Sequence, residues 1–210
     1  MNGKIHDITP EISEQMAVYP GDTPFSRNVL LDMNAGANLT LSEITTTVHI
    51  GAHADAPNHY ATNGVGISER PLDFYFGTCQ VITVKVPVGA RILPEHLEGR
   101  TIEATRVLFR TGSFPDFSKW RSDYNSLSPD LIEFLAHRKV RLVGIDTPSI
   151  DPDEAKELLA HAAVAAHDMA VLEGLALANV PDGMYQLVAL PLKIRGADAS
   201  PVRAILIERE

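Results

Sequence analysis

Short apolar segments separated by polar turns run along most of this chain. Several alternate apolar and polar residues or are rich in valine and isoleucine: TLSEITTTVHI, CQVITVKVPV, RVLFRTG, VRLVGID, MYQLVALPL and VRAILIER. Both patterns are typical of β-strands, with alternation favouring a half-buried strand and the continuous runs a fully buried one. The hydrophobic pattern therefore predicts a fold that is rich in strands.

Two segments have the pattern of helices instead. In SPDLIEFLAHR, Ser128 suits the N-cap position and Pro129 suits the first helical position. The segment DPDEAKELLAHAAVAAHDM repeats this arrangement, with Asp151 before Pro152 and further acids in the first turn. We therefore predict that the second helix begins at about Asp151.

The balance of these elements predicts the fold class. The 210 residues suffice for one domain with a sizeable core, and the sequence contains neither an internal repeat nor a linker. Strands outnumber helices, and the two kinds of element are interleaved along the chain. We expect one mixed α/β domain over residues 1–210, in which a few helices flank a curved, barrel-like mixed β-sheet.

Composition and charge exclude several classes of partner. Apolar residues make up 45% and charged residues 21% of the chain, as in ordinary soluble proteins, and no apolar run reaches the ~18 residues of a membrane helix. The first residues lack the basic-then-apolar pattern of a signal peptide, so we expect a cytoplasmic protein. The net charge of −9, without a cluster of lysine and arginine, argues against nucleic acid or an anionic membrane as the main partner.

Cysteine usage limits the kinds of metal site that the chain can build. Cys79 is the only cysteine, so an intrachain disulfide and a thiolate-rich zinc site are both excluded. We expect Cys79 to be a small core residue. Any bound metal ion must be held by imidazole and carboxylate groups.

Such groups are concentrated in the segment HIGAHADAPNHY. His49, His53 and Asp55 share one parity along the chain, opposite to the apolar face that Ile44 and Ile50 would present to the core. A straight strand would place the His49 and His53 α-carbons ~13 Å apart, too far for one ion with ligand bonds of ~2 Å. The chain must bend for both histidines to reach one ion.

Gly51 is the residue at which this bend costs least. A single histidine in a loop is more often an ordinary polar residue, but H-x-x-x-H-x-D beside a glycine favours a metal site. Histidine and aspartate ligands suit Zn²⁺ or Mn²⁺, and three protein ligands leave a coordination position open for catalysis. His59 follows four residues after Asp55 and is equally consistent with a ligand, a nearby base or a surface histidine.

The same segment resembles a known family. H-I-G-A-H-A-D-A-P-x-H is similar to the H-x-G-[TA]-H-x-D-x-P-x-H signature of the metal-dependent cyclase-like hydrolases, whose best-known members are the bacterial kynurenine formamidases, or arylformamidases. Further similar stretches extend from about residue 18 to about residue 206: VYPGDTPF, LTLSEITTTVHIGAHADAP, VLFRTGSFPD, LVGIDTPSIDP, MAVLEGL and DASPVRAIL. The resemblance implies the swivelling β/β/α, cyclase-like fold.

The resemblance also implies a centre with two divalent metal ions, usually zinc, although manganese is an alternative. The ligands that it implies are His49, His53, Asp55, His161 and Glu173. Asp55 would bridge the two ions, and His59 would be the catalytic acid and base. Tyr19 stands before P-G-D, where the family commonly has a tryptophan that lines the substrate pocket, so Tyr19 is the expected substrate contact.

The residues themselves do not connect His161 and Glu173 to this segment. His161 lies on an apolar helix pattern, where a histidine is by default a satisfied core or boundary residue. Glu173 lies in the apolar run MAVLEGLAL, where a carboxylate is costly unless it is paired, protonated or bound to a metal ion. Only the family pattern assigns both residues to one centre.

The activity implied by the resemblance is hydrolysis of N-formyl-L-kynurenine to L-kynurenine and formate, a step of tryptophan degradation. Family members are usually homodimers in which the N-terminal segment helps to form the partner's site, so we expect a homodimer acting on a small molecule. Two alternatives stay open. One is a related aryl-amide or lactam hydrolase that resembles the isatin hydrolases, and the other is a non-catalytic metal-binding protein of the same fold.

Overall fold

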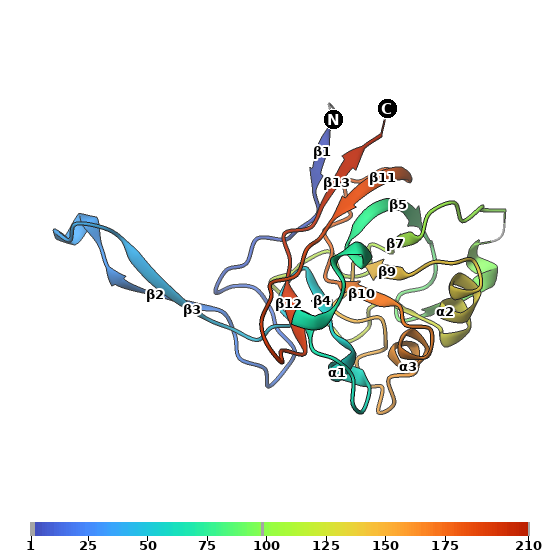
Figure 1. The fold of residues 1–210 in the computed structure, drawn as a ribbon, viewed down its shortest axis with the longest axis horizontal. Coiled ribbons are helices and arrows are strands. Elements are labelled where there is room, and N and C mark those ends of the chain that lie inside the picture. The colour runs from blue at the N-terminus through green and yellow to red at the C-terminus, as the bar shows by residue number, and fades with distance from the viewer. Residues whose placement is uncertain (1–2, 98, 210) are drawn as a thin grey trace.

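The computed structural model describes residues 3–97 and 99–209. Its central element is a curved sheet of nine strands with helices packed on one side (Figure 1). In spatial order the strands are β1 (Ile5–Asp7), β13 (Ile205–Glu208), β11 (Gly183–Val188), β5 (Phe76–Thr83), β7 (Arg106–Arg110), β9 (Leu142–Ile145), β10 (Ala170–Glu173), β4 (His53–Asp55) and β12 (Ala199–Pro201). The expected mixed α/β fold with a curved sheet is confirmed.

The middle of the sheet is parallel and its two sides are antiparallel. Strands β5, β7, β9 and β10 pair in parallel, whereas β4 and β12 on one side and β11, β13 and β1 on the other pair antiparallel. Parallel strands are normally covered on both faces, which explains the nearly continuous apolar runs in this part of the sequence. In β9, Leu142 faces one apolar cluster and Val143 faces the other.

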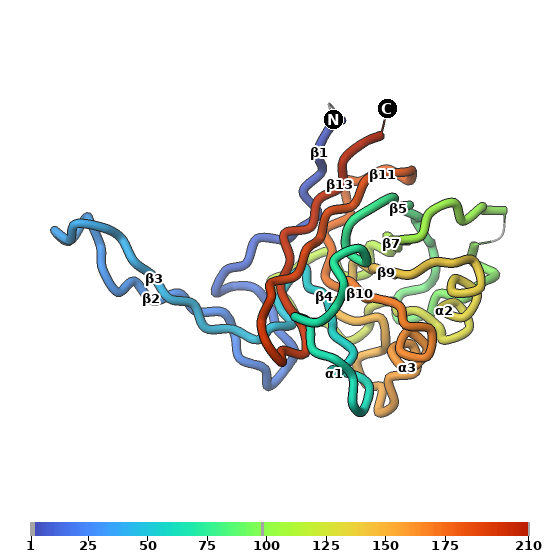
Figure 2. The backbone as a smooth tube through the Cα atoms, in the orientation of Figure 1, coloured from blue at the N-terminus to red at the C-terminus, as the bar shows by residue number. Residues whose placement is uncertain are grey.

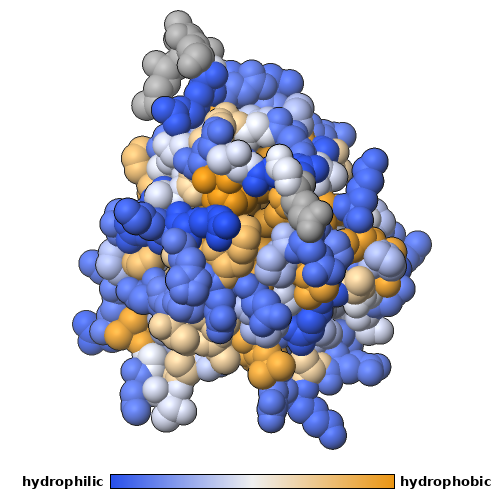
Figure 3. Space-filling view, turned by 90° about the vertical axis from the view of Figure 1, so that its right-hand side faces the viewer, coloured by the Kyte–Doolittle hydropathy of each residue, from blue (hydrophilic) through white to orange (hydrophobic). Residues whose placement is uncertain are grey.

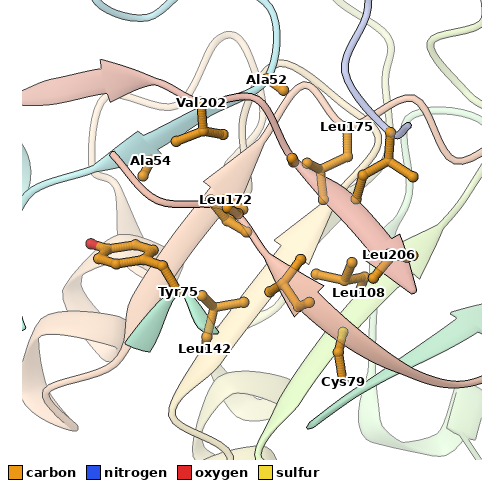
Figure 4. Close-up of a cluster of buried hydrophobic side chains, with 14 of the residues drawn as sticks. Ala52, Ala54, Tyr75, Cys79, Leu108, Leu142, Leu172, Leu175, Val202 and Leu206 are labelled. Carbon is orange, nitrogen blue, oxygen red and sulfur yellow. The ribbon is translucent and has the colours of Figure 1, made fainter. Parts of the chain in front are cut away.

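The two apolar clusters lie on opposite faces of the sheet. The first fills the concave side, where side chains from β4, β7, β9, β10 and β13 meet (Figure 4). Cys79 is fully buried in this cluster, which confirms that it is a core residue. The second cluster packs the other face against the helices, through residues such as Leu131 and Val164. Burial of this kind stabilises a domain by about 25 cal/mol for each Å² of apolar surface removed from water.

Three α-helices are present in the described residues: α1 (Pro57–Tyr60), α2 (Pro129–Ala136) and α3 (Leu159–Ala166). Helix α2 begins as predicted, because the Ser128 hydroxyl accepts a hydrogen bond of 3.0 Å from the Leu131 amide and Pro129 follows the cap. Short 3₁₀ turns span Met33–Ala35, Ile67–Glu69, Leu72–Phe74 and Pro94–Leu97.

The predicted start of the second helix is wrong, since α3 begins at Leu159. The Asp151 carboxylate still caps this helix, but it does so from a distance, by accepting 3.1 Å hydrogen bonds from the amides of Ala160 and His161. Residues 152–158 form turns between the cap and the helix. The capping interaction was therefore predicted correctly and its place along the chain was not.

A two-stranded hairpin of β2 (Ser26–Leu31) and β3 (Leu41–Thr45) projects from the body of the protein (Figures 1 and 2). The predicted core face of the segment leading to His49 is therefore only partly correct. Ile50 is 1% exposed, but Ile44 is 64% exposed, because β3 pairs only with β2 and lies outside the body. A second small parallel pair joins β6 (Arg91–Ile92) to β8 (Ser126–Leu127).

The face opposite the hairpin is mainly hydrophilic, with small apolar areas between polar side chains (Figure 3). No helix among the described residues has both the length and the apolar character needed to cross a membrane. The first and last strands of the described chain, β1 and β13, pair at one end of the sheet (Figure 1).

Candidate metal centre

Strand β4 carries His53 and Asp55 on one side of the sheet, because residues two apart in a strand share a face. The strand lies between β10 and β12, and its register places His53 directly opposite Glu173. Opposite residues of an antiparallel pair have neighbouring side chains. As a result, His53 Nε2 lies 3.3 Å from Glu173 Oε2 and 3.4 Å from Asp55 Oδ1.

The bend predicted at Gly51 is present and brings His49 to the same place. Gly51 has a φ of 57°, in the left-handed region that glycine adopts without strain. The rings of His49 and His53 have centroids 5.1 Å apart, and His49 Nδ1 lies 3.2 Å from Asp55 Oδ1. A Cβ atom at Gly174, directly after β10, would collide with the Gly51 carbonyl, so a glycine there lets the bend pack against the strand.

His161 reaches the cluster from helix α3. Its Nε2 lies 3.2 Å from Asp55 Oδ2 and 3.4 Å from Glu173 Oε1. Its Nδ1 donates a 2.9 Å hydrogen bond to Asp151, the same carboxylate that caps the helix. The structure thus brings together the five ligands implied by the resemblance, including the two that the residues alone could not connect.

The hydrogen bonds on the outer side of the histidines fit metal binding. His53 donates from Nδ1 to the Gly51 carbonyl at 2.9 Å, and His49 donates from Nε2 to Asp198 at 3.0 Å. Like His161, each histidine has one nitrogen held by an acceptor outside the cluster and the other turned towards Asp55. This arrangement fixes each ring and directs its inner nitrogen at the carboxylates, where a metal ion would take the place of a proton.

The carboxylates provide the other half of the donor set. Asp55 is fully buried, and its Oδ1 has no hydrogen-bond partner in the described structure. A buried acceptor without a partner is costly, and a cation would remove that cost. Two groups have ligand atoms within 4.8 Å of one another, His53 with Asp55 and Glu173, and His49 with Asp55 and His59. Nitrogen and oxygen donors of this kind suit a divalent metal ion.

The buried carboxylates of the cluster favour the binding of positive charge. Burial alone would raise the pKa of Asp55, but the hydrogen bond from His161 to Oδ2 and the nearby His49 and His53 rings hold this pKa well below its usual range. Burial lowers the pKa of His49, yet the negative charge of the neighbouring Asp55 outweighs this effect and the pKa rises to about 9. The carboxylates are therefore ionised, and they attract protons or a metal cation to the same nitrogens.

His59 lies beside these residues but in a different environment. Helix α1 holds it with its ring centroid 4.2 Å from that of His49, and burial lowers its pKa. Its Nδ1 lies 3.7 Å from Asp198 Oδ2. A largely neutral imidazole next to the cluster is able to accept and return a proton near neutral pH.

Asp198 is a residue that the sequence reasoning did not assign. It lies just before β12 and faces both His49 and His59. Asp198 belongs to the stretch DASPVRAIL, which resembles the family, but the resemblance did not imply a role for this residue. Because Asp198 is far from the histidines in sequence, only the pairing of β12 with β4 places it there.

A cavity of about 440 Å³ opens beside the cluster, and part of its wall is formed by aromatic rings. Tyr19 lines it and is 50% exposed, with its ring edge-on to Trp120 at a centroid distance of 5.5 Å. The other aromatic residues of this wall are Phe114, Phe117 and Tyr124. These residues follow β7 and were not identified from the sequence, although the similar stretch VLFRTGSFPD contains the first of them. The cavity suits a flat, aromatic ligand.

Of the residues that follow β9, some stabilise a loop and others line the cavity. The Asp146 carboxylate accepts hydrogen bonds from the amides of Thr111 and Gly112, so it holds the loop that begins the aromatic wall. Ser149 lines the cavity. Turn and loop chemistry thus accounts for Asp146.

The variant Asp151→Asn tests the outer hydrogen bond of His161. The asparagine side chain can still accept a hydrogen bond from the α3 amides, but it no longer presents a negatively charged acceptor to His161 Nδ1. We expect the affinity for a divalent ion to fall about 10- to 100-fold, measured by competition with a chromophoric chelator. Asp130→Asn, in the exposed first turn of α2, is the matched control and should leave the affinity unchanged. Equal affinities in the two variants would contradict the role given to Asp151.

Comparisons with known proteins agree with this geometry. The model of the "Putative cyclase" family matches residues 6–152. Kynurenine formamidases of Bordetella pertussis and Bordetella bronchiseptica are each 45% identical over 206 residues, which is 98% of this chain and 98% of each relative. A solved structure described as a potential metal-dependent hydrolase with cyclase activity superposes with a TM-score of 0.86 at 29% identity, covering 99% of this chain and 98% of the other.

Proposed function

The chain belongs to the Cyclase family, and from this premise we propose that it is an arylformamidase, an enzyme that hydrolyses N-formyl-L-kynurenine to L-kynurenine and formate. The observation that carries the proposal is the convergence of three imidazoles on the buried Asp55, with Glu173 beside two of them, next to a cavity with an aromatic wall. The identity with two kynurenine formamidases over almost the whole chain supports the choice of substrate.

We propose that the centre binds two divalent ions per subunit, with zinc as the first candidate and manganese as the alternative. His49, His53 and Asp55 would hold one ion, and His161 and Glu173 would hold the other. Asp55 would be shared, which is supported by its two oxygens: Oδ1 faces His49 and His53, and Oδ2 faces His161. Divalent ions bound there would supply Lewis-acid activation of a water molecule and of the formyl carbonyl.

The chain's own residues would then manage the proton. During hydrolysis a water oxygen bonds to the formyl carbon, the bond from that carbon to the anilide nitrogen breaks, and the nitrogen gains a proton. His59 is the proposed carrier of this proton, because its pKa is lowered by burial and its ring lies beside that of His49. General acid–base catalysis of this kind contributes about 10²- to 10⁴-fold to a rate.

The aromatic wall would position the substrate ring. Tyr19 and Trp120 lie edge-on to each other at the cavity, so a bound aryl ring would meet one face and one edge. Such arrangements contribute about 0.5–1.5 kcal/mol per pair beyond the area that they bury. In this proposal Tyr19 contacts the substrate, and Trp120 supplies an indole close to the position where relatives commonly have tryptophan.

We further propose that the protein is a homodimer in the cytoplasm. The hairpin β2–β3 supports this, because it projects from the body and exposes several large apolar side chains: Val29, Leu30, Leu31, Met33, Leu39, Leu41 and Ile44. An apolar surface on an isolated hairpin is costly in water, and a second subunit would cover it. Residues that line the cavity, including Tyr19 and Asp22, lie directly before this hairpin.

The proposed activity is tested with purified protein loaded with zinc or with manganese. N-formyl-L-kynurenine and isatin are supplied separately, and L-kynurenine, formate and isatinate are quantified. We expect formate and L-kynurenine in equal amounts and at least tenfold lower kcat/KM with isatin, which a pocket built for an open-chain amide would fit less well. A preference for isatin would show that the protein is the alternative lactam hydrolase. No turnover of either compound would favour the alternative of a non-catalytic metal-binding protein.

A further inference from the structure

The cavity beside the centre is lined by acids and aromatic rings, and its described lining includes no lysine or arginine. The acids among the lining residues are Asp22, Asp153, Glu173 and Asp198. Glu173 and Asp198 face histidines of the centre. Asp22 and Asp153 form no ion pair with any residue that the structure describes, so they give the rest of the cavity a negative character.

Asp153 is the more enclosed of these two acids and lies against an indole. Its Oδ1 and the Trp120 Nε1 atom are both shielded from solvent, and the indole lies within interaction range of the carboxylate. Burial raises the pKa of Asp153, and the neighbouring Trp120 side chain counteracts this. Trp120 in turn packs edge-on against Tyr124, with centroids 6.3 Å apart, which fixes the indole at the wall.

A carboxylate beside aromatic rings is the combination that recognises a primary ammonium group. The carboxylate accepts charge-assisted hydrogen bonds, and the ring face attracts the cation through its quadrupole. A carboxylate on a ligand would find no lysine or arginine among the described lining residues, and positive charge in the cavity would be confined to the centre itself, where the formyl group reacts. Away from the centre, its transfer from water into the cavity would be unfavourable because no lysine or arginine of the described lining would compensate its charge.

We propose that Asp153, with Trp120 beside it, binds the ammonium group of the substrate, and that no side chain of the cavity binds the substrate's α-carboxylate. This inference rests on the proposed function and deepens it, since N-formyl-L-kynurenine carries both groups on its side chain. The enzyme then selects aryl formamides that bear an amine. The α-carboxylate stays in solvent, and substrates without it are accepted.

Four substrates separate the contributions of the two groups: N-formyl-L-kynurenine, its decarboxylated analogue, its deaminated analogue, and formanilide, which has neither group. For the parent enzyme we expect kcat/KM of the decarboxylated analogue to stay within about threefold of the full substrate. Loss of the amine should lower kcat/KM about tenfold or more, mainly through KM, as for a charge-assisted hydrogen bond made equally in the ground and transition states.

The variant Asp153→Asn should reduce the preference for the amine-bearing substrate over the deaminated one to nearly one. Glu154→Gln is the matched control: it removes the same charge from the next residue, which is exposed and does not line the cavity, and it should keep the preference. Metal content is measured in both variants, so that a disturbed Asp151 turn is recognised.

Equal use of the aminated and deaminated substrates by the parent enzyme would overturn the inference and leave the arylformamidase proposal intact. The same holds if the decarboxylated analogue is a poor substrate, or if Asp153→Asn lowers kcat/KM for all four compounds by one common factor. Failure of the loaded enzyme to hydrolyse any of the four, formanilide included, would overturn both proposals.

Discussion

Replacing Asp55 with alanine is expected to remove divalent-metal binding and to lower kcat/KM for formyl release by about a thousandfold or more. The physical reason is that Asp55 alone contacts all three histidines of the cluster, through His49 and His53 on Oδ1 and His161 on Oδ2. Metal activation contributes several kcal/mol to the stabilisation of transition-state charge, and each 1.36 kcal/mol is worth about tenfold in rate. Metal content by mass spectrometry and steady-state kinetics measure the two effects.

Asp130→Asn is the control for this variant because it removes an exposed carboxylate remote from the cavity lining. It should keep both metal and activity. Because Asp55→Ala leaves three buried histidines without their shared carboxylate partner, the variant is expected to lose some stability, and circular dichroism verifies that the protein measured is folded. Full metal occupancy in Asp55→Ala would contradict the assignment of Asp55 as the shared ligand.

Replacing His59 with alanine is expected to lower kcat about 10²- to 10⁴-fold while both metal content and KM change little. His59 borders the cluster, with its ring 4.2 Å from that of His49, but it lies outside the five proposed ligands. The loss therefore falls on proton transfer. The measurement is a comparison of kcat and metal stoichiometry in the same preparation.

His137→Gln, at the exposed C-cap of α2, is the matched histidine control and should behave like the parent enzyme. The arrangement of His59 with His49 and Asp55 within 4.8 Å leaves a second outcome that would be informative. If His59→Ala lost metal in proportion to activity, His59 would be a ligand and the proposed proton carrier would have to be another residue.

The local sequence was sufficient to predict much of the part of the site that the segment around His49 and His53 forms. The strand alternation, the spacing of His49 and His53 and the glycine between them were sufficient to predict a bend at Gly51, and the φ of this residue confirms it. The cap of α2 at Ser128 was equally local. These features depend on a few neighbouring residues, so the physical chemistry of the backbone determines them.

The remote part of the site depends on strand pairing, which composition and periodicity do not encode. Glu173 reaches His53 because β10 pairs antiparallel with β4, and Asp198 reaches His49 because β12 pairs with the other edge of β4. Asp151 acts on α3 across turns that the helix pattern concealed. Ile44 was misplaced for a related reason, since an alternating strand in a projecting hairpin has the same pattern as one that covers a core.

Anomalous scattering from crystals of the active, metal-loaded enzyme tests the central claim most directly. The account predicts anomalous peaks within ~2 Å of Asp55 oxygens and of the inner nitrogens of His49, His53 and His161, with an absorption edge that identifies the element. The absence of any peak among these atoms in an active crystal, or a peak at another site only, would contradict it.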